Sequence, residues 1–397
     1  MTGSVNEILL RNVRAVLPER TVVIDGLVIK DGLISEILDS SLKTPPKAKS
    51  VLDLKGLTVF PGFIDVHIHG AVGIDLMEAD ATGLRRVSQF LATQGTCAWL
   101  PTLVPASQEN YQAAVTAIDE LMGSQWDAEG PVVARALGVH YEGPFVSEVQ
   151  CGALHKEFFR KFCGPASLND LPVPGSSEAR KMMTVAPEIE GGAALVRELK
   201  NRGWVVSLGH TRAGVESLEQ AHAAGASHMT HFMNAMAPLH HRSPGPVAWG
   251  LGRDDVSCDF IADGIHLDPF ILKMLVKLKG RDRLILISDA IAATGMGDGD
   301  FQIWDETISV KDGRTSNARG SIAGSVITML DAVRLMLSLG VAEVDVARMA
   351  ATNPSELLGV SNECGAIEVG KRADLVALDR EGNVALTLVG GTVAYRR

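Results

Sequence analysis

The alternation of hydrophobic and polar residues separates the two ends of the chain from its middle. Residues 22–38 alternate apolar and polar side chains around Gly26 and Gly32, which predicts short antiparallel strands joined by turns. The segment 364–397 repeats this pattern. We therefore predict that residues 1–58 and 359–397 together form one small β domain, a β-sandwich built from both chain termini, with residues 59–358 as a folded insertion between them.

The middle of the chain follows a repeated strand–helix pattern. Helical patterns at 193–203 and 216–225 end at glycine, as helix C-termini prefer. Residues 163–180 are rich in Pro, Gly and Ser and predict a surface loop. Eight apolar runs typical of strands lie at 58–69, 96–100, 135–142, 183–187, 204–210, 227–231, 257–263 and 284–289. Eight such strands predict an α/β fold, a (β/α)₈ TIM-like barrel over residues 59–358.

Composition and charge narrow the class of protein. The 397 residues are 46% hydrophobic and 21% charged, which indicates a folded globular chain. The net charge is −10 and no basic block stands out, so we expect neither a nucleic-acid nor a membrane partner. Five scattered cysteines without a CxxC motif, and no signal-peptide pattern, favour a reduced, cytoplasmic protein.

Polar residues with metal-binding or acid–base chemistry recur where the predicted strands end. Because the C-terminal ends of barrel strands converge on one face, we expect these side chains to lie together. Histidine and carboxylate groups at one mouth predict a metal site. The residues are His67, His69, Glu142, His210, His231 and Asp289.

Each of these residues also has a structural explanation. His67 and His69 lie two positions apart and so point to the same side of a strand, where a hydrogen-bonded core pair is the alternative. Glu142 could cap the segment that follows, although an ionised carboxylate there needs a cation or hydrogen-bond donors. For Asp289, at the end of a strongly apolar strand, the alternative is a structural salt bridge.

The other two histidines have local competitors. His210 could instead neighbour the N-cap of the next helix. His231 has a competitor in His228, three residues earlier, but on a strand the two face opposite sides. Because His231 lies nearer the C-terminal end of its strand, we favour it as the ligand.

Taken in order, these motifs resemble the amidohydrolase superfamily and, within it, the N-acetylglucosamine-6-phosphate deacetylases. The similarity extends from FPGFIDVHIHG to KRADLVALD, over essentially the whole chain. The motifs are HIH at 67–69, EGPF at 142–145, SLGHT at 207–211, THFMNAM at 230–236, ADGIH at 262–266 and SDA at 288–290.

The resemblance implies a divalent metal, held mainly by Glu142, His210 and His231, with His67 and His69 as the pair that can hold a second ion. It implies Asp289 as the catalytic aspartate. Imidazole and carboxylate ligands favour zinc, while Fe, Co and Mn stay open. The implied reaction is hydrolysis of the acetamide of a phosphorylated N-acetyl amino sugar, releasing acetate, in a homodimeric enzyme.

The resemblance also implies substrate contacts, and one segment departs from the family pattern. Arg242 and His266 become phosphate-binding candidates, because an arginine fork suits phosphate geometry; for Arg242 the alternative is a solvated loop arginine. The family usually reads G-A-H after EGPF, whereas this chain has Gly152-Ala153-Leu154-His155, so Leu154 occupies the usual histidine position. The substrate-contact candidates are Ala153, His155, Asn234, Ala235, Arg242, His266 and Ile322.

Three other functions stay open at this stage. A related enzyme could act on another N-acetyl amino sugar. A cyclic-amide hydrolase of the same superfamily typically carries a carboxylated lysine at a strand end, and no predicted strand here ends in lysine. The third alternative is a non-catalytic barrel that has lost its metal, against which the full set of Glu142, His210, His231 and Asp289 argues.

Overall fold

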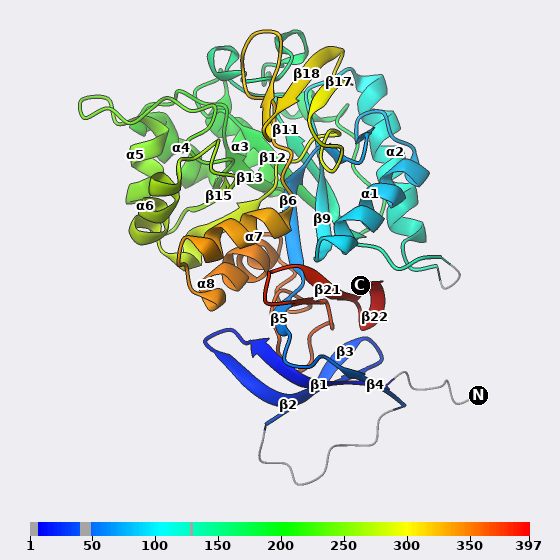
Figure 1. Ribbon diagram of the computed structural model, residues 1–397. Helices are drawn as coiled ribbons and strands as arrows, with labels where there is room; N and C mark the ends of the chain where they lie inside the picture. Colours follow the sequence, from blue (N-terminus) through cyan, green and yellow to red (C-terminus); the bar gives the residue numbers. More distant parts are fainter. Residues whose placement is uncertain (1–6, 40–48, 128–129) are drawn as a thin grey trace.

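A parallel barrel and a second sheet from the chain termini make up the molecule (Figure 1). The computed structural model describes residues 7–39, 49–127 and 130–397, so residues 1–6 and 40–48 of the predicted N-terminal β segment lie outside the described residues. The predicted (β/α)₈ barrel with a β domain from both termini is confirmed. No helix among the described residues combines the length and apolar character needed to cross a membrane.

The barrel strands are parallel and neighbour one another in chain order. A short strand β10 (Arg135–Ala136) adds to β9. The ring closes through hydrogen bonds from the amide of His69 to the carbonyl of Ala290 (2.8 Å) and from the amide of Asp289 to the carbonyl of His67 (2.9 Å). The eight strands are β6 (Phe63–Ile68), β9 (Thr96–Leu103), β11 (Gly138–Glu142), β12 (Arg180–Val185), β13 (Val205–Leu208), β14 (His228–Met229), β15 (Ser257–Ile261) and β16 (Leu284–Ile287).

Helices surround the barrel, and the longer ones bury an apolar face against it. In α3, Leu195, Val196 and Leu199 are buried, which is the spacing of one helix face. The predicted helix at 216–225 is α4, which ends at Gly225 with φ 116°, a conformation that glycine adopts readily. The helices are α1 (Ala81–Thr93), α2 (Gln108–Ser124), α3 (Gly192–Asn201), α4 (Val215–Ala224), α5 (Gly245–Gly252), α6 (Pro269–Lys279), α7 (Met329–Ser338), α8 (Glu343–Ala347) and α9 (Asn353–Leu357), with a π-helical turn at Arg348–Thr352.

The connection between β11 and β12 differs from the others. It contains 3₁₀ turns at Glu148–Gln150, Lys156–Phe158 and Pro165–Leu168 and no α-helix among the described residues. The predicted surface loop at 163–180 lies here, with Leu168 and Leu171 turned inward.

The terminal sheet pairs strands from both ends of the chain, and one of its faces forms a separate hydrophobic core. The predicted antiparallel pair at 22–38 is β2 and β3, joined by Asp31 and Gly32 with φ of 51° and 82°, the signature of a type I′ turn. The strands are β1 (Glu7–Val16), β2 (Thr21–Lys30), β3 (Leu33–Leu38), β4 (Ser50–Asp53), β5 (Thr58–Pro61), β20 (Leu375–Leu378), β21 (Val384–Val389) and β22 (Thr392–Arg396).

The prediction of a single strand at 58–69 is wrong, because this run forms two strands in different sheets. β5 pairs with β1 and β20 of the terminal sheet, whereas β6 pairs with β9 of the barrel. Gly62 lies between them at a tight approach, where a Cβ would come within 2.2 Å of the Cys97 Sγ. The predicted domain boundaries at 58/59 and 358/359 stay predictions.

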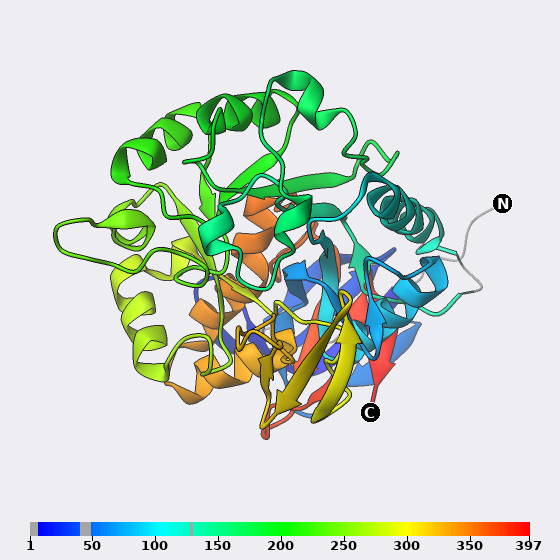
Figure 2. The ribbon, with the colours of Figure 1, turned by 90° about the horizontal axis from the view of Figure 1, so that it is seen from above.

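A small antiparallel sheet over the barrel was not predicted. It consists of β17 (Gly299–Ile303), β18 (Glu306–Lys311) and β19 (Arg314–Ser316). Figures 1 and 2 show it at the end of the barrel opposite the terminal sheet, above the carboxyl ends of the barrel strands. A two-stranded ribbon, β7 (Gly70–Ala71) and β8 (Ile74–Asp75), follows β6 at the same end.

Candidate metal centre

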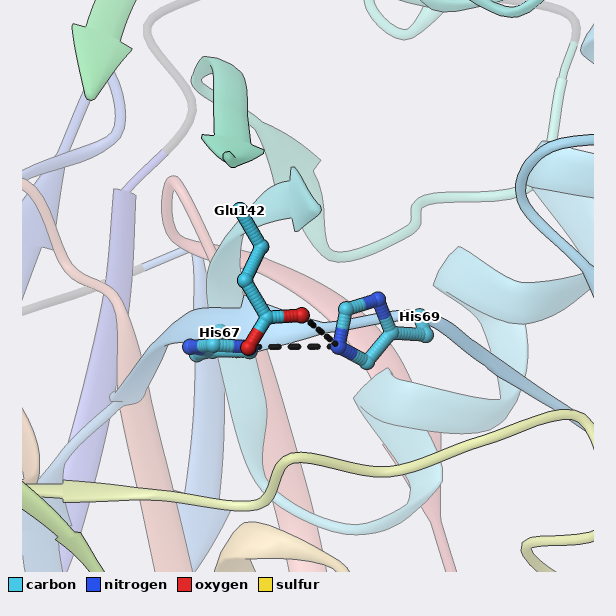
Figure 3. Close-up of side chains that lie close together, drawn as sticks. All are labelled: His67, His69 and Glu142. Carbon is cyan, nitrogen blue, oxygen red and sulfur yellow. Dashed lines mark hydrogen bonds and ion pairs between the residues drawn. The ribbon is translucent and has the colours of Figure 1, made fainter. Parts of the chain in front are cut away.

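Six predicted side chains meet at the carboxyl mouth of the barrel, each at most 7% exposed. Glu142 Oε1 lies 2.9 Å from the Nε2 atoms of both His210 and His231. Its other oxygen lies 3.4 Å from His69 Nε2, and Figure 3 shows this carboxylate facing the rings of His67 and His69. The geometry therefore forms two donor groups, His67–His69–Glu142 and Glu142–His210–His231, which share Glu142.

Asp289 reaches the same centre from the end of β16. Its Oδ1 lies 3.2 Å from His69 Nε2 and 3.5 Å from His67 Nε2. Asp289, His210 and His231 all have positive φ values, of 52°, 47° and 30°. Non-glycine residues in this region are strained, and such strain is concentrated at functional sites. The backbone after three barrel strands is thus turned so that these side chains point to one centre.

The second ring nitrogens hold the histidines in orientation. The Nδ1 atoms of His210 and His231 lie 2.7 Å and 3.2 Å from the carbonyl oxygens of Gln150 and Asn234. An imidazole that donates from Nδ1 to a carbonyl keeps the lone pair of Nε2 free for a metal. This is the tautomer that a ligand histidine needs.

The donor set fits a divalent cation. The Nε2 atoms of His67 and His69 lie 3.1 Å apart, and so do those of His210 and His231. Two lone pairs facing one another at this distance repel unless a proton or a cation lies between them. Imidazole nitrogen with carboxylate oxygen is a ligand set that zinc and other first-row divalent ions accept.

The electrostatics of the cluster keep both carboxyl groups ionised. Burial alone raises the pKa of Glu142, but His67 and the hydrogen bonds from His210 and His231 outweigh it and hold that pKa well below its usual value. Burial also opposes ionisation of Asp289, yet His67 and His69 lower its pKa overall. Burial lowers the pKa of His231, but its hydrogen bond to Glu142 and the nearby carboxylates raise the pKa to about 9.

We expect metal binding to the metal-free protein at pH 7 to release protons. With a pKa of about 9, His231 carries a proton at this pH, and a ligand imidazole must lose it. Calorimetric titration of the metal-free protein in buffers of different ionisation enthalpy measures this release. A binding enthalpy that does not depend on the buffer would contradict the prediction.

Two buried carboxylates that the sequence analysis missed support the metal centre from below. Asp65 accepts hydrogen bonds from the backbone amides of His67 (3.3 Å) and Ser288 (3.2 Å). Asp259 accepts from the amide of His231 and lies 2.8 Å from His228 Nε2. His228, the competitor of His231, therefore faces Asp259 and not the metal centre. Each carboxylate thus fixes the backbone of a predicted ligand, His67 for Asp65 and His231 for Asp259.

A cavity of about 340 Å³ opens above the metal centre. Such a volume suits a small ligand. Among its lining residues are the predicted substrate contacts Ala153, Asn234, Ala235, His266 and Ile322.

The structure does not bring two other predicted contacts to this cavity. Leu154 lines it in place of His155, whose Nδ1 lies 3.1 Å from the exposed carboxylate of Glu157. Arg242 is exposed in the loop between β14 and α5 and contacts the neighbouring His241. This loop protrudes at the left edge of Figures 1 and 2. Both side chains were assigned through the family resemblance, and their loop geometry directs them elsewhere in this chain.

Sequence reasoning also missed lining residues, above all Trp304 at the tip of the β17–β18 hairpin. The Asp312-Gly313 pair that joins β18 to β19 is a hairpin signal, and it was the available sign of this small sheet.

Comparison with known proteins identifies the family to which the chain belongs. The amidohydrolase family profile matches residues 58–394. The chain belongs to the amidohydrolase family. Members of this family depend on metal, which agrees with the two His/Glu donor groups of this amidohydrolase.

Individual relatives show which enzymes of this family the chain is similar to. The chain is 35% identical to an N-acetylglucosamine-6-phosphate deacetylase of Bacillus subtilis over 96% of both chains. It is 34% identical to an N-acetylgalactosamine-6-phosphate deacetylase of Escherichia coli O157:H7, over 93% of this chain and 94% of that one. The crystal structure of an N-acetylglucosamine-6-phosphate deacetylase from Pasteurella multocida superposes with a TM-score of 0.88 at 29% identity, covering 98% of this amidohydrolase and 99% of that chain.

Proposed function

We propose that this amidohydrolase removes acetate from N-acetylglucosamine 6-phosphate, giving glucosamine 6-phosphate in amino-sugar metabolism. The observation that carries the proposal is the buried centre of four histidines, Glu142 and Asp289 at the base of a cavity, in a chain similar over nearly its whole length to deacetylases of this substrate. A complete centre of this kind argues against a non-catalytic barrel. Among the described residues, no lysine lines the cavity, which argues against the cyclic-amide hydrolases.

The proposed reaction is hydrolysis of an amide assisted by a divalent metal. A divalent metal held by Glu142, His210 and His231 acidifies water and polarises a carbonyl when bound. Asp289, ionised because its pKa lies below the usual value, accepts the proton of the attacking water. Asp289 then returns this proton to the departing amine, which is necessary because an amide anion is a poor leaving group.

Zinc is our proposed metal, and the His67–His69 pair gives room for a second ion beside the first. Iron, cobalt and manganese accept the same donors. Elemental analysis of the purified protein identifies the metal and counts the ions per chain. We further propose a cytoplasmic homodimer.

The second candidate function concerns the sugar epimer, because an N-acetylgalactosamine-6-phosphate deacetylase is almost as similar to this chain as an N-acetylglucosamine-6-phosphate deacetylase. The test of the proposed function is an acetate-release screen over N-acetylglucosamine, N-acetylgalactosamine and N-acetylmannosamine, each with and without the 6-phosphate. Fastest turnover of N-acetylglucosamine 6-phosphate supports the proposal. Faster turnover of another epimer reassigns the substrate, and no acetate release from any of them overturns the proposal.

We expect Arg242→Ala to lower kcat/KM for the phosphorylated substrate by about 10–150-fold, since charge-assisted hydrogen bonds to phosphate contribute about 1.5–3 kcal/mol. The unphosphorylated sugar never makes this contact and should be hardly affected. Steady-state kinetics on both substrates measure the difference, and equal loss on both would mean that Arg242 supports only its loop.

Arg242 does not line the cavity of its own chain, so its proposed role requires a second copy of the protein. Co-expression of Arg242→Ala with Asp289→Asn tests this directly. In a mixed dimer one site retains Asp289 together with Arg242 from the neighbour, so activity should exceed that of either variant alone. Activity no higher than that of Arg242→Ala would exclude a contribution from the neighbouring chain.

A further inference from the structure

Trp304 occupies an unusual place at the mouth of the cavity. It forms, with Asp305, the two-residue turn between β17 and β18, where Ile303 pairs with Glu306. Both turn residues have positive φ, 54° for Trp304 and 57° for Asp305. Type I′ turns of this kind prefer Asn and Gly, so a bulky tryptophan here is strained. The strained turn places the large indole at the cavity, and Trp304 is the residue of this hairpin that lines it.

Packing on two sides holds the indole in place. Trp304 packs against the hydrophobic cluster of its own sheet, which contains Ile303, Ile308 and Ala323, and Ala153 packs against this same cluster. It also packs against a second cluster, of Val104, Val146, Leu154 and Ala186, which follow the carboxyl ends of β9, β11 and β12.

Arg319 connects the same two parts. It donates to the carbonyl of Ala153 (3.1 Å) and forms an ion pair with Glu306 beside the turn (3.5 Å). The hairpin tip and the loop of Ala153 and Leu154 are thus tied together. We call the cavity surface formed by Trp304, Leu154 and Ala153 the acyl wall.

Within the acyl wall, Trp304 lies directly beside His69. The Trp304 ring meets the ring of His69 edge to face, with centroids 5.4 Å apart at 88°. Glu142 separates His69 from His231, since one carboxylate oxygen faces each of them. The carbonyl oxygen of Asn234 lies 3.2 Å from His231 Nδ1, and Asn234 and His266 both line the cavity. The cavity therefore has an apolar indole beside His69 and a polar side chain beside His231.

An N-acylated amino sugar has the same asymmetry. Its reacting carbonyl must lie at the centre, near Glu142 and Asp289, so the acyl chain and the sugar extend in opposite directions. Hydroxyl and phosphate groups need hydrogen-bond partners when they leave water, whereas an acyl methyl group favours an apolar surface. This match places the sugar toward Asn234 and His266, and the acyl group toward Trp304.

We propose that Trp304, supported by Leu154, determines the size of the N-acyl group that the site accepts. The inference rests on the proposed deacetylase function and adds the acyl specificity of that same site. Leu154 stands where the family usually has a histidine, so the change makes this wall apolar. The indole fills the space that a longer acyl chain needs, which restricts the substrate to short acyl groups.

The test compares the N-acetyl, N-propionyl and N-butyryl forms of glucosamine 6-phosphate by release of the free amine. One methylene in an apolar pocket changes kcat/KM by about 10–200-fold. We expect wild-type kcat/KM to fall at least about tenfold from acetyl to butyryl. In Trp304→Ala the butyryl-to-acetyl ratio should rise at least about tenfold. A wild-type enzyme without acyl-length preference, or a Trp304→Ala ratio equal to wild type, overturns the inference.

Phe301→Ala is the matched control. Phe301 is half-buried on the same hairpin and packs against the same cluster, but it is not among the residues that line the cavity. Its loss loosens the hairpin without enlarging the acyl wall, so the ratio should stay at the wild-type value. An equal rise in Phe301→Ala would assign selectivity to hairpin packing and overturn the role of the Trp304 side chain.

Further variants separate the remaining outcomes. If the Trp304→Ala variant loses its metal, the Trp304→Leu variant is tested in its place. We expect a smaller rise of the butyryl-to-acetyl ratio in Trp304→Leu, and an unchanged ratio would count against the inference. Leu154→Ala should shift the ratio in the same direction, because it enlarges the same wall. If the wild-type enzyme cleaves none of the three substrates, the proposed function fails. If it cleaves the acetyl form and the ratios do not respond, only the acyl inference fails.

Discussion

Replacing Asp289 by asparagine is expected to lower kcat by about 10²–10⁴-fold, the usual contribution of a general base. Asparagine keeps the size of the side chain but cannot accept the proton of the attacking water. The carboxylate is 7% exposed and its pKa lies below the usual value because His67 and His69 outweigh the effect of burial. It is therefore ionised at neutral pH and ready to accept a proton.

Turnover, metal content and the pH profile together measure this effect. A carboxyl group with a lowered pKa loses its activity only as the pH falls through that pKa, so the variant should also lose the acid limb of the profile that Asp289 causes. Metal content should stay at the wild-type level, because Glu142, His210 and His231 remain. Asp25→Asn, an exposed change on β2, is the control and should be neutral. Near-normal turnover of Asp289→Asn would remove Asp289 from the mechanism.

The convergence of the site was predictable because it depends on few physical rules. Parallel strands of a barrel bring their C-terminal ends to one face. A histidine or carboxylate that ends an apolar run must therefore lie at that face. Even β14, with only the two residues His228 and Met229, obeys this rule, since His231 follows it into the centre. The structure brings all six predicted metal-centre residues together.

Features that depend on distant partners could not be predicted in this way. Asp65 is one carboxylate in an apolar strand, and its partner Ser288 lies 223 positions further along the chain. The apolar run 58–69 contains strands of two sheets, and hydrophobic periodicity does not report a change of sheet. The signal that existed was the Pro61-Gly62 pair, a common breaker of regular structure.

Loop side chains were predictable only by analogy. His155 and Arg242 were assigned through family motifs, and the direction of each side chain is decided by the packing of its loop. His155 and Arg242 belong to family motifs but do not line the cavity, whereas Trp304 belongs to no motif and lines it because of a strained turn. Strand ends can thus be placed from sequence alone, whereas the loops that select the substrate cannot.

Glu142→Ala is expected to remove all bound metal and all measurable activity together. Glu142 is shared by both donor groups: Oε1 lies 2.9 Å from His210 and His231, and Oε2 lies 3.4 Å from His69. Its removal also takes away one of the two carboxylates that offset the charge of a divalent ion and leaves only Asp289, which lies beside His67 and His69. Elemental analysis and acetate release on the same sample measure both effects.

The double variant His67→Ala/His69→Ala is the informative comparison, because it removes one donor group and leaves the other intact. Glu142, His210 and His231 remain within reach of one ion, so the double variant should lose at most one metal equivalent and keep the other. Retention of metal by Glu142→Ala would show that the histidines suffice without the carboxylate. Complete loss of metal from the double variant would invert the assignment and place the primary ion at His67 and His69. In that case Asp289, which lies 3.2 Å from His69, would be a ligand of that ion as well as a base.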